Sequence, residues 1–135
     1  MIWEQHQKLC ESGNLAGLLA ELENERDLIE RECLYVGTVH MTYRQHPDVT
    51  IAIGIKYIEE FYQNPKPFGP DLPPNGDVLK RLVLLLDPAQ YEEEDMGNKE
   101  LAIWVCKFGL AFGVLDGTKG GFKARLNNLE ISSEQ

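Results

Sequence analysis

The sequence predicts an all-α fold in which six or seven helices pack as antiparallel hairpins, as a helical bundle or a short helical-repeat-like array. Three observations predict it. Apolar residues recur at intervals of three and four, which places them on one face of a helix. The breaks between these patterns hold Asn, Asp, Gly and Pro, the residues that begin and end helices. Only one stretch, residues 34–43, also fits a strand.

The first half of the chain, residues 1–63, predicts four helices. A short helix over residues 2–10 ends at Gly13, and Asn14 caps the next. The third lies within residues 24–44, and the fourth follows Pro47, with Asp48 as its cap, and stops at Asn64. The apolar positions expected to face the core are Leu15, Leu18, Leu19, Leu22, Ile29, Cys33, Val36, His40, Ile51, Ile55, Ile58 and Tyr62.

Residues 34–43 are rich in β-branched and aromatic side chains, which strands favour. A strand needs a partner, and no second convincing strand pattern exists in the sequence. We therefore expect a helix here, with a strand as the open alternative.

Residues 64–76 form the clearest break in the sequence, because five of these thirteen residues are proline. Proline prevents both a helix and an inner strand, so the segment should be extended and stiff. We expect a single helical domain over residues 1–135. Its halves are 1–63 and 77–131, joined by this Pro-rich connector and followed by a frayed tail at 132–135.

The second half, residues 77–131, predicts three helices and an additional turn. The first helix is capped near Asn75 or Asp77, and the turn starts at Asp87. An acidic run at 92–95 should form a solvated first helical turn, and Asp116 should end the apolar helix that follows Asn98. The expected core positions are Val78, Leu79, Leu82, Val83, Leu86, Leu101, Trp104, Val105, Phe108, Phe112, Leu115, Phe122, Leu126 and Leu129.

The charge balance restricts the classes of partner. With 22 acidic against 13 basic side chains, the chain carries a net charge of −9. Nucleic acids and anionic membranes are bound by Lys and Arg, so we expect neither as a partner. The acidity fits a soluble protein, or one that binds a basic protein surface.

The sequence also predicts a cytoplasmic protein. Its longest uncharged apolar run, Leu82 to Leu86, is far shorter than the roughly 20 residues that a membrane span needs. The N-terminal residues lack the pattern of a secretory signal. The three cysteines, Cys10, Cys33 and Cys106, are scattered, as expected of free thiols in a reducing compartment.

No catalytic residue, metal ligand or cofactor is predicted. Cys33 and His40 lie two helical turns apart, about 10 Å, too far for one metal to bridge. The serines lack a nucleophile-elbow pattern. The glycine-rich residues 113–121 resemble a phosphate-binding loop only superficially, because Thr118 precedes Lys119 rather than following it. We expect residues 113–121 to form a flexible turn between two helices. The alternative is that backbone N–H groups at the start of the next helix bind an anion.

Two function classes follow. The first is a non-enzymatic interaction module (an adaptor, an assembly factor or an immunity-type inhibitor) that binds a protein through acidic and Pro-rich surfaces. The second is a small enzyme or ligand-binding domain with a pocket between the halves, lined by His40, Tyr43, Arg44 and Tyr57. A homodimer is also considered, because Ile2, Trp3 and Trp104 add more apolar surface than one small core can cover, which would leave an apolar helix face exposed. The predicted partner-binding residues are Glu25, Glu32, Phe68, Leu72, Glu92, Glu93, Glu94 and Asp95. The alternative for Phe68 and Leu72 is that they fold back to cover the core while the prolines stiffen a crossover.

Overall fold

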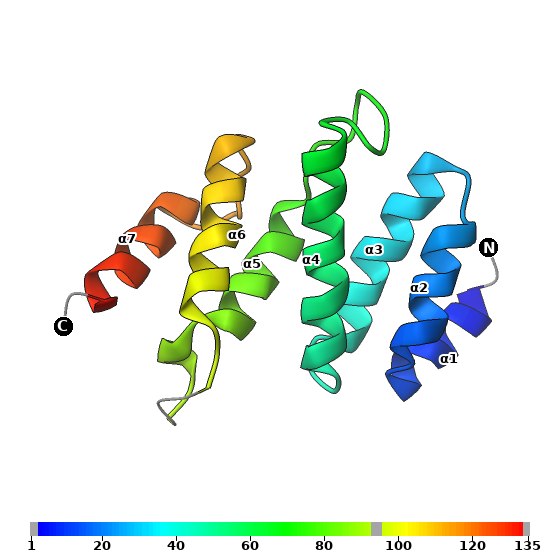
Figure 1. Cartoon of the computed structure of the whole chain (residues 1–135), viewed down its shortest axis with the longest axis horizontal. Coiled ribbons are helices and arrows are strands. Elements are labelled where there is room, and N and C mark those ends of the chain that lie inside the picture. The colour runs from blue at the N-terminus through cyan, green and yellow to red at the C-terminus, as the bar shows by residue number, and fades with distance from the viewer. Residues whose placement is uncertain (1–2, 93–95, 134–135) are drawn as a thin grey trace. The chain divides into compact units, whose positions relative to one another are not determined.

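The computed structural model describes residues 3–92 and 96–133, and within them it is all-α, as predicted. Seven α-helices and one short 3-10 turn follow one another through these described residues, and Figure 1 shows the helices in order. The helices are α1 (Trp3–Ser12), α2 (Leu15–Asn24), α3 (Leu28–Thr42), α4 (Pro47–Gln63), α5 (Gly76–Leu86), α6 (Lys99–Ala111) and α7 (Gly121–Ser133), with the 3-10 turn η1 at Pro88–Gln90.

The chain divides into two compact units, Met1–Pro73 and Pro74–Gln135, so the boundary falls inside the Pro-rich segment. In unit 1, α1 packs on α2 and α3, and α3 forms an antiparallel hairpin with α4 (Figure 1). In unit 2, α6 packs against both α5 and α7. Each unit is thus a small layer of consecutive helices, as short connections favour.

Most of the predicted helix boundaries are confirmed by their hydrogen bonds. The side chains of Asn14, Asn75 and Asn98 each accept a backbone N–H from the first turn of the following helix, at 2.9–3.1 Å. Gly13 ends α1 with a φ of +65°, a conformation that glycine adopts without steric cost. The start of α4 differs from the prediction. His46 occupies the cap position and Pro47 the first turn, so Asp48 lies inside the helix.

Residues 34–42 lie in α3 and Tyr43 is its C-cap, which excludes the strand alternative, but the predicted core face of α3 is wrong. Ile29 and His40 are exposed, and Cys33 and Val36 are half-buried. The same error occurs in α4, where Ile51 and Ile55 are half-buried and Tyr62 is exposed. The buried positions are Leu34, Tyr35, Thr38, Val39 and Thr42 of α3, and Val49, Thr50, Ile53, Gly54, Tyr57, Ile58 and Phe61 of α4.

The buried threonines explain why the apolar pattern misled. A threonine hydroxyl can enter a core at little cost if it finds hydrogen-bond partners there. The Thr38 hydroxyl donates to the Leu34 carbonyl at 2.6 Å, and the Thr42 hydroxyl to the Thr38 carbonyl at 2.7 Å. The hydroxyls of Thr42 and Thr50 lie 2.6 Å apart and join α3 to α4. Because these hydroxyls have hydrogen-bond partners, threonines can lie on the buried faces of α3 and α4.

Unit 2 follows the apolar pattern more closely. The five predicted core residues of α5 are all buried, as are Val105 and Phe108 of α6. A Cβ on Gly109 would lie 2.8 Å from the ring of Phe122, so this glycine permits the close approach of α6 and α7. However, α6 ends at Ala111 rather than near Asp116, which leaves Leu115 85% exposed. α7 reaches Ser133, two residues into the predicted tail.

Candidate functional site

An open cleft of about 290 Å³ lies in unit 1, between the first turn of α3 and the Pro-rich segment. Residues 27–29 form one wall, and residues 68–72 form the other. The two walls are about forty residues apart in the sequence. Leu28 and Ile29 are 48% and 63% exposed, so large apolar side chains lie at the surface beside it. Such a surface is more typical of a binding site than of a solvated turn.

The position of Leu28 and Ile29 follows from the cap of α3. Asp27 accepts the backbone N–H groups of Ile29 and Glu30, both at 3.0 Å, and so fixes the start of the helix. Leu28 and Ile29 are therefore in the first turn, about one and a half turns before the first buried residue of α3, Leu34.

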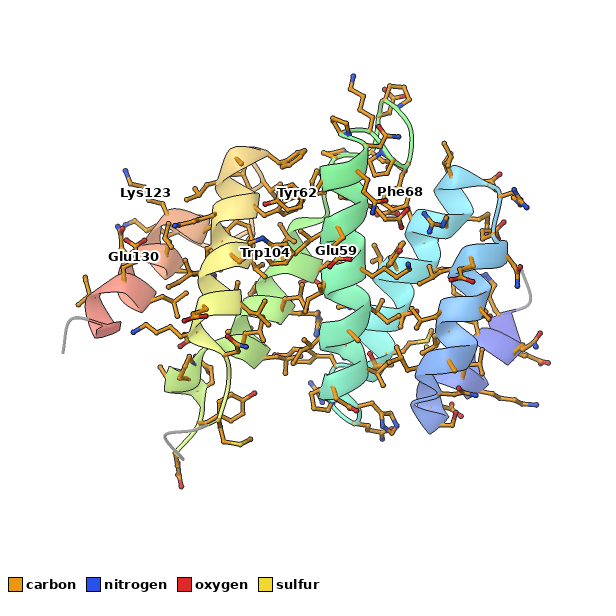
Figure 2. All side chains as sticks on the ribbon, viewed as in Figure 1. Glu59, Tyr62, Phe68, Trp104, Lys123 and Glu130 are labelled. Atoms are coloured by element: carbon orange, nitrogen blue, oxygen red, sulfur yellow. The ribbon has the colours of Figure 1, made fainter. Side chains whose placement is uncertain are left out.

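Phe68 anchors the opposite wall. Figure 2 labels Phe68 beside α4. Its ring is buried and lies 5.6–5.8 Å from the rings of Tyr35, Tyr57 and Phe61, in edge-to-face contacts. The segment thus folds back onto α3 and α4 through one aromatic side chain, and the prolines on either side of it stiffen the return. Phe68 is therefore part of the core, and Leu72, which is half-buried, is the more accessible of the two predicted anchors.

The surroundings of the cleft are acidic. Asp27 and Asp71 line it, and none of its lining residues is basic. Residues 21–32 hold six carboxylates against two guanidinium groups. One of these guanidinium groups, that of Arg31, is paired with Glu60. Asp71 is exposed, and within the described residues it makes no hydrogen bond or ion pair.

The remaining predicted partner-binding residues lie in different surroundings. Glu25 is half-buried and accepts the backbone N–H of Asp27 at 3.2 Å, beside the cleft wall. Glu32 is half-buried on α3, and burial raises the pKa of its carboxyl. Glu92 is exposed in unit 2, in a bend rather than in the predicted first turn of a helix, because α6 begins at Lys99. Glu93, Glu94 and Asp95 lie outside the described residues.

The four residues proposed to line a pocket between the halves all belong to unit 1. Tyr57 is fully buried in the aromatic cluster with Tyr35 and Phe68. His40 and Arg44 are exposed, and Tyr43 is half-buried. The pocket between the halves stays a prediction.

A second polar cluster joins the first three helices. His6 is completely buried, and its Nδ1 lies 2.7 Å from Glu21 Oε1. Its Nε2 lies 3.6 Å from the Cys10 sulfur and 3.5 Å from the Thr38 hydroxyl. The order Cys–His–Glu is that of a nucleophilic triad, but burial raises the pKa of the Cys10 thiol to about 11. A thiol that stays protonated and inaccessible is a weak nucleophile, so the cluster ties α1 to its neighbours.

Asp116 is the buried charge that sequence reasoning missed. Its carboxylate accepts the backbone N–H of Thr118 at 2.9 Å, the Thr118 hydroxyl, and Arg125 Nε at 2.7 Å. Burial alone would raise the pKa of Asp116, but these hydrogen bonds outweigh it and hold the pKa at about 2. An ionised carboxylate therefore lies beside Gly121, at the start of α7, and disfavours the anion considered for this loop.

Within residues 3–92 and 96–133, no group of three or more His, Cys, Asp or Glu side chains is arranged so that it could hold a metal ion. None of the described helices combines the length and apolar character that crossing a membrane demands. No protein-family model matches the chain, and no curated protein or solved structure was found to match it.

Proposed function

We propose that this chain is a non-enzymatic interaction module that binds a basic segment of a partner protein at the unit 1 cleft. The observation that carries the proposal is the coincidence of exposed apolar side chains, Leu28 and Ile29, with an acidic surround at a stiff, Pro-rich wall. An apolar centre with a charged rim is the usual organisation of a protein–protein interface. The roles of adaptor, assembly factor and immunity-type inhibitor all fit such a site.

The reactive side chains also fit this proposal better than an enzyme. Burial raises the pKa of both the Cys10 and Cys106 thiols to about 11, and His6 is enclosed by hydrogen-bond partners. None of these three residues lines the cleft. A catalytic site needs such groups to converge where a substrate can reach them.

The test is quantitative affinity capture of the whole chain from native cell extract, with mass spectrometry of the bound proteins. Ile29→Ser removes an exposed apolar side chain at the cleft. Ile131→Ser is the matched control, because Ile131 is 57% exposed on α7. We expect Ile29→Ser to deplete the specific partner at least roughly fivefold, as interface anchors do, and Ile131→Ser to leave it unchanged.

Circular dichroism must show the same helix content for the two variants and the parent chain. The proposal fails if no protein is captured above background, or if the captured proteins are insensitive to Ile29→Ser.

A further inference from the structure

The cleft of the proposed function has a size and chemistry that narrow what binds there. At about 290 Å³ it lies at the lower limit of the ~300–1,000 Å³ range of small-molecule pockets. A cleft of this volume accommodates one long side chain rather than a cofactor. Its walls supply apolar surface from Leu28, Ile29 and Leu72, next to the carboxylates of Asp27 and Asp71.

The charge of the ligand is inferred from which nearby charged and polar groups already have hydrogen-bond or ion-pair partners. The N-terminus of a helix ordinarily attracts an anion through its free N–H groups. Here Asp27 takes the N–H groups of Ile29 and Glu30. Arg31, a basic residue near the start of α3, does not line the cleft and is paired with Glu60. Among the described residues Asp71 has no ion pair, so the cleft favours a cation.

The Pro-rich wall adds a second preference, for a ligand rich in hydrogen-bond donors. Residues 68–72, which form this wall, have five backbone carbonyls, and Pro70 among them has no backbone N–H. The five carbonyls and the Asp71 carboxylate therefore outnumber the four backbone N–H donors of the wall. A guanidinium group has five N–H donors, is weakly hydrated for a cation, and is carried on an apolar stem.

We propose that the cleft binds an arginine side chain from an extended segment of the partner protein. The stem lies along Leu28, Ile29 and Leu72, and the guanidinium group donates to the Asp71 carboxylate. This inference rests on the proposed function and specifies the partner residue at the same site.

The test is selection of displayed random 12-residue peptides on the immobilised whole chain, followed by synthesis of the enriched peptide. We expect an arginine next to apolar residues in the enriched set. Replacing that arginine with citrulline, which is neutral and of similar shape, should weaken binding roughly tenfold, because a charged donor is lost. Asp71→Asn should weaken it similarly, without changing the thermal unfolding midpoint.

A matched control and a double-mutant cycle localise the contact. Glu59→Gln removes the same charge from an exposed position on α4 (Figure 2) and should change affinity less than twofold. If Asp71 contacts the arginine, citrulline and Asp71→Asn together should cost no more than either alone. Additive losses, or an enriched set without basic residues, overturn the arginine site but leave the proposed function standing. If no enriched peptide is sensitive to Ile29→Ser, the proposed function falls as well.

Discussion

The two units build their cores differently. In unit 1, the interfaces of α3 bury His6, Thr38, Thr42 and Thr50 with their hydrogen bonds made. In unit 2, the helix interfaces are almost wholly apolar, and the buried charge lies in the loop before α7. Buried hydrogen bonds can fix which helix faces meet, while apolar surface supplies most of the stability. Unit 1 thus buries hydroxyl and imidazole groups at its helix interfaces, while Leu28 and Ile29 are exposed beside the cleft.

The aromatic cluster gives the sharpest test of unit 1. Phe68→Ala should lower the free energy of unfolding by about 3–5 kcal/mol, because it leaves a cavity among Tyr35, Tyr57 and Phe61. Chemical denaturation measures the loss. The matched control, Phe112→Ala, removes a half-buried ring at the end of α6 and should cost roughly half as much or less. Equal costs would mean that the cluster does not hold the Pro-rich wall in place.

In unit 2, Asp116→Asn should lower the free energy of unfolding by about 2 kcal/mol at pH 7. The folded-state pKa of Asp116, about 2, is below its ordinary value of 3.8, so the folded state favours the ionised carboxylate. This stability is present above about pH 4 and is lost as the pH falls towards 2. The difference between variant and parent should therefore shrink over the same range. A difference that stays constant with pH would contradict the role of the charge.

The hydroxyl pair between α3 and α4 tests whether unit 1 depends on polar pairing. Thr42→Val or Thr50→Val alone should cost about 1 kcal/mol, because each removes the hydroxyl–hydroxyl hydrogen bond between α3 and α4. The double variant should cost less than the sum of the two, since both single variants lose this same hydrogen bond. Strict additivity in denaturant unfolding would show that the two side chains act independently.

Glu32 should give the smallest effect, with the opposite sign. Burial raises the pKa of Glu32, so its ionised form opposes folding at neutral pH, and the penalty fades as the pH falls. Glu32→Gln should therefore raise the free energy of unfolding at pH 7, by less than about 0.5 kcal/mol. Glu23→Gln, at an exposed position on α2, is the control and should have no effect. A destabilised Glu32→Gln variant would indicate that the carboxylate has a stabilising partner.

The same difference between the units determined how much of the fold could be predicted. In α5 the apolar residues repeat regularly, and every predicted core position is buried. In α3 and α4 the same rule selected Ile29 and Ile51 and passed over Thr38 and Thr50, because apolar periodicity gives no weight to a hydroxyl that bonds to its own helix. Helix caps depend on local residues, and Asn14 and Asn75 were predicted correctly, whereas Asp48 lies inside α4 and not at its cap.

Only half of the candidate site was visible in the sequence. The Pro-rich segment was recognised from its composition, and Leu72 was among the predicted anchors. The wall formed by Leu28 and Ile29 was not, because it faces residues about forty positions further along the chain. Asp116 was missed for a similar reason: its partner Arg125 is nine residues away, across a loop whose course the sequence does not reveal.

The central claim is that binding takes place at the unit 1 cleft. Hydrogen–deuterium exchange of the whole chain, with and without a saturating concentration of the selected peptide, tests it most directly. We predict slower exchange at the amides of residues 28–31 and of Gly69, Asp71 and Leu72, with α5, α6 and α7 unchanged. Protection confined to unit 2 would contradict the account.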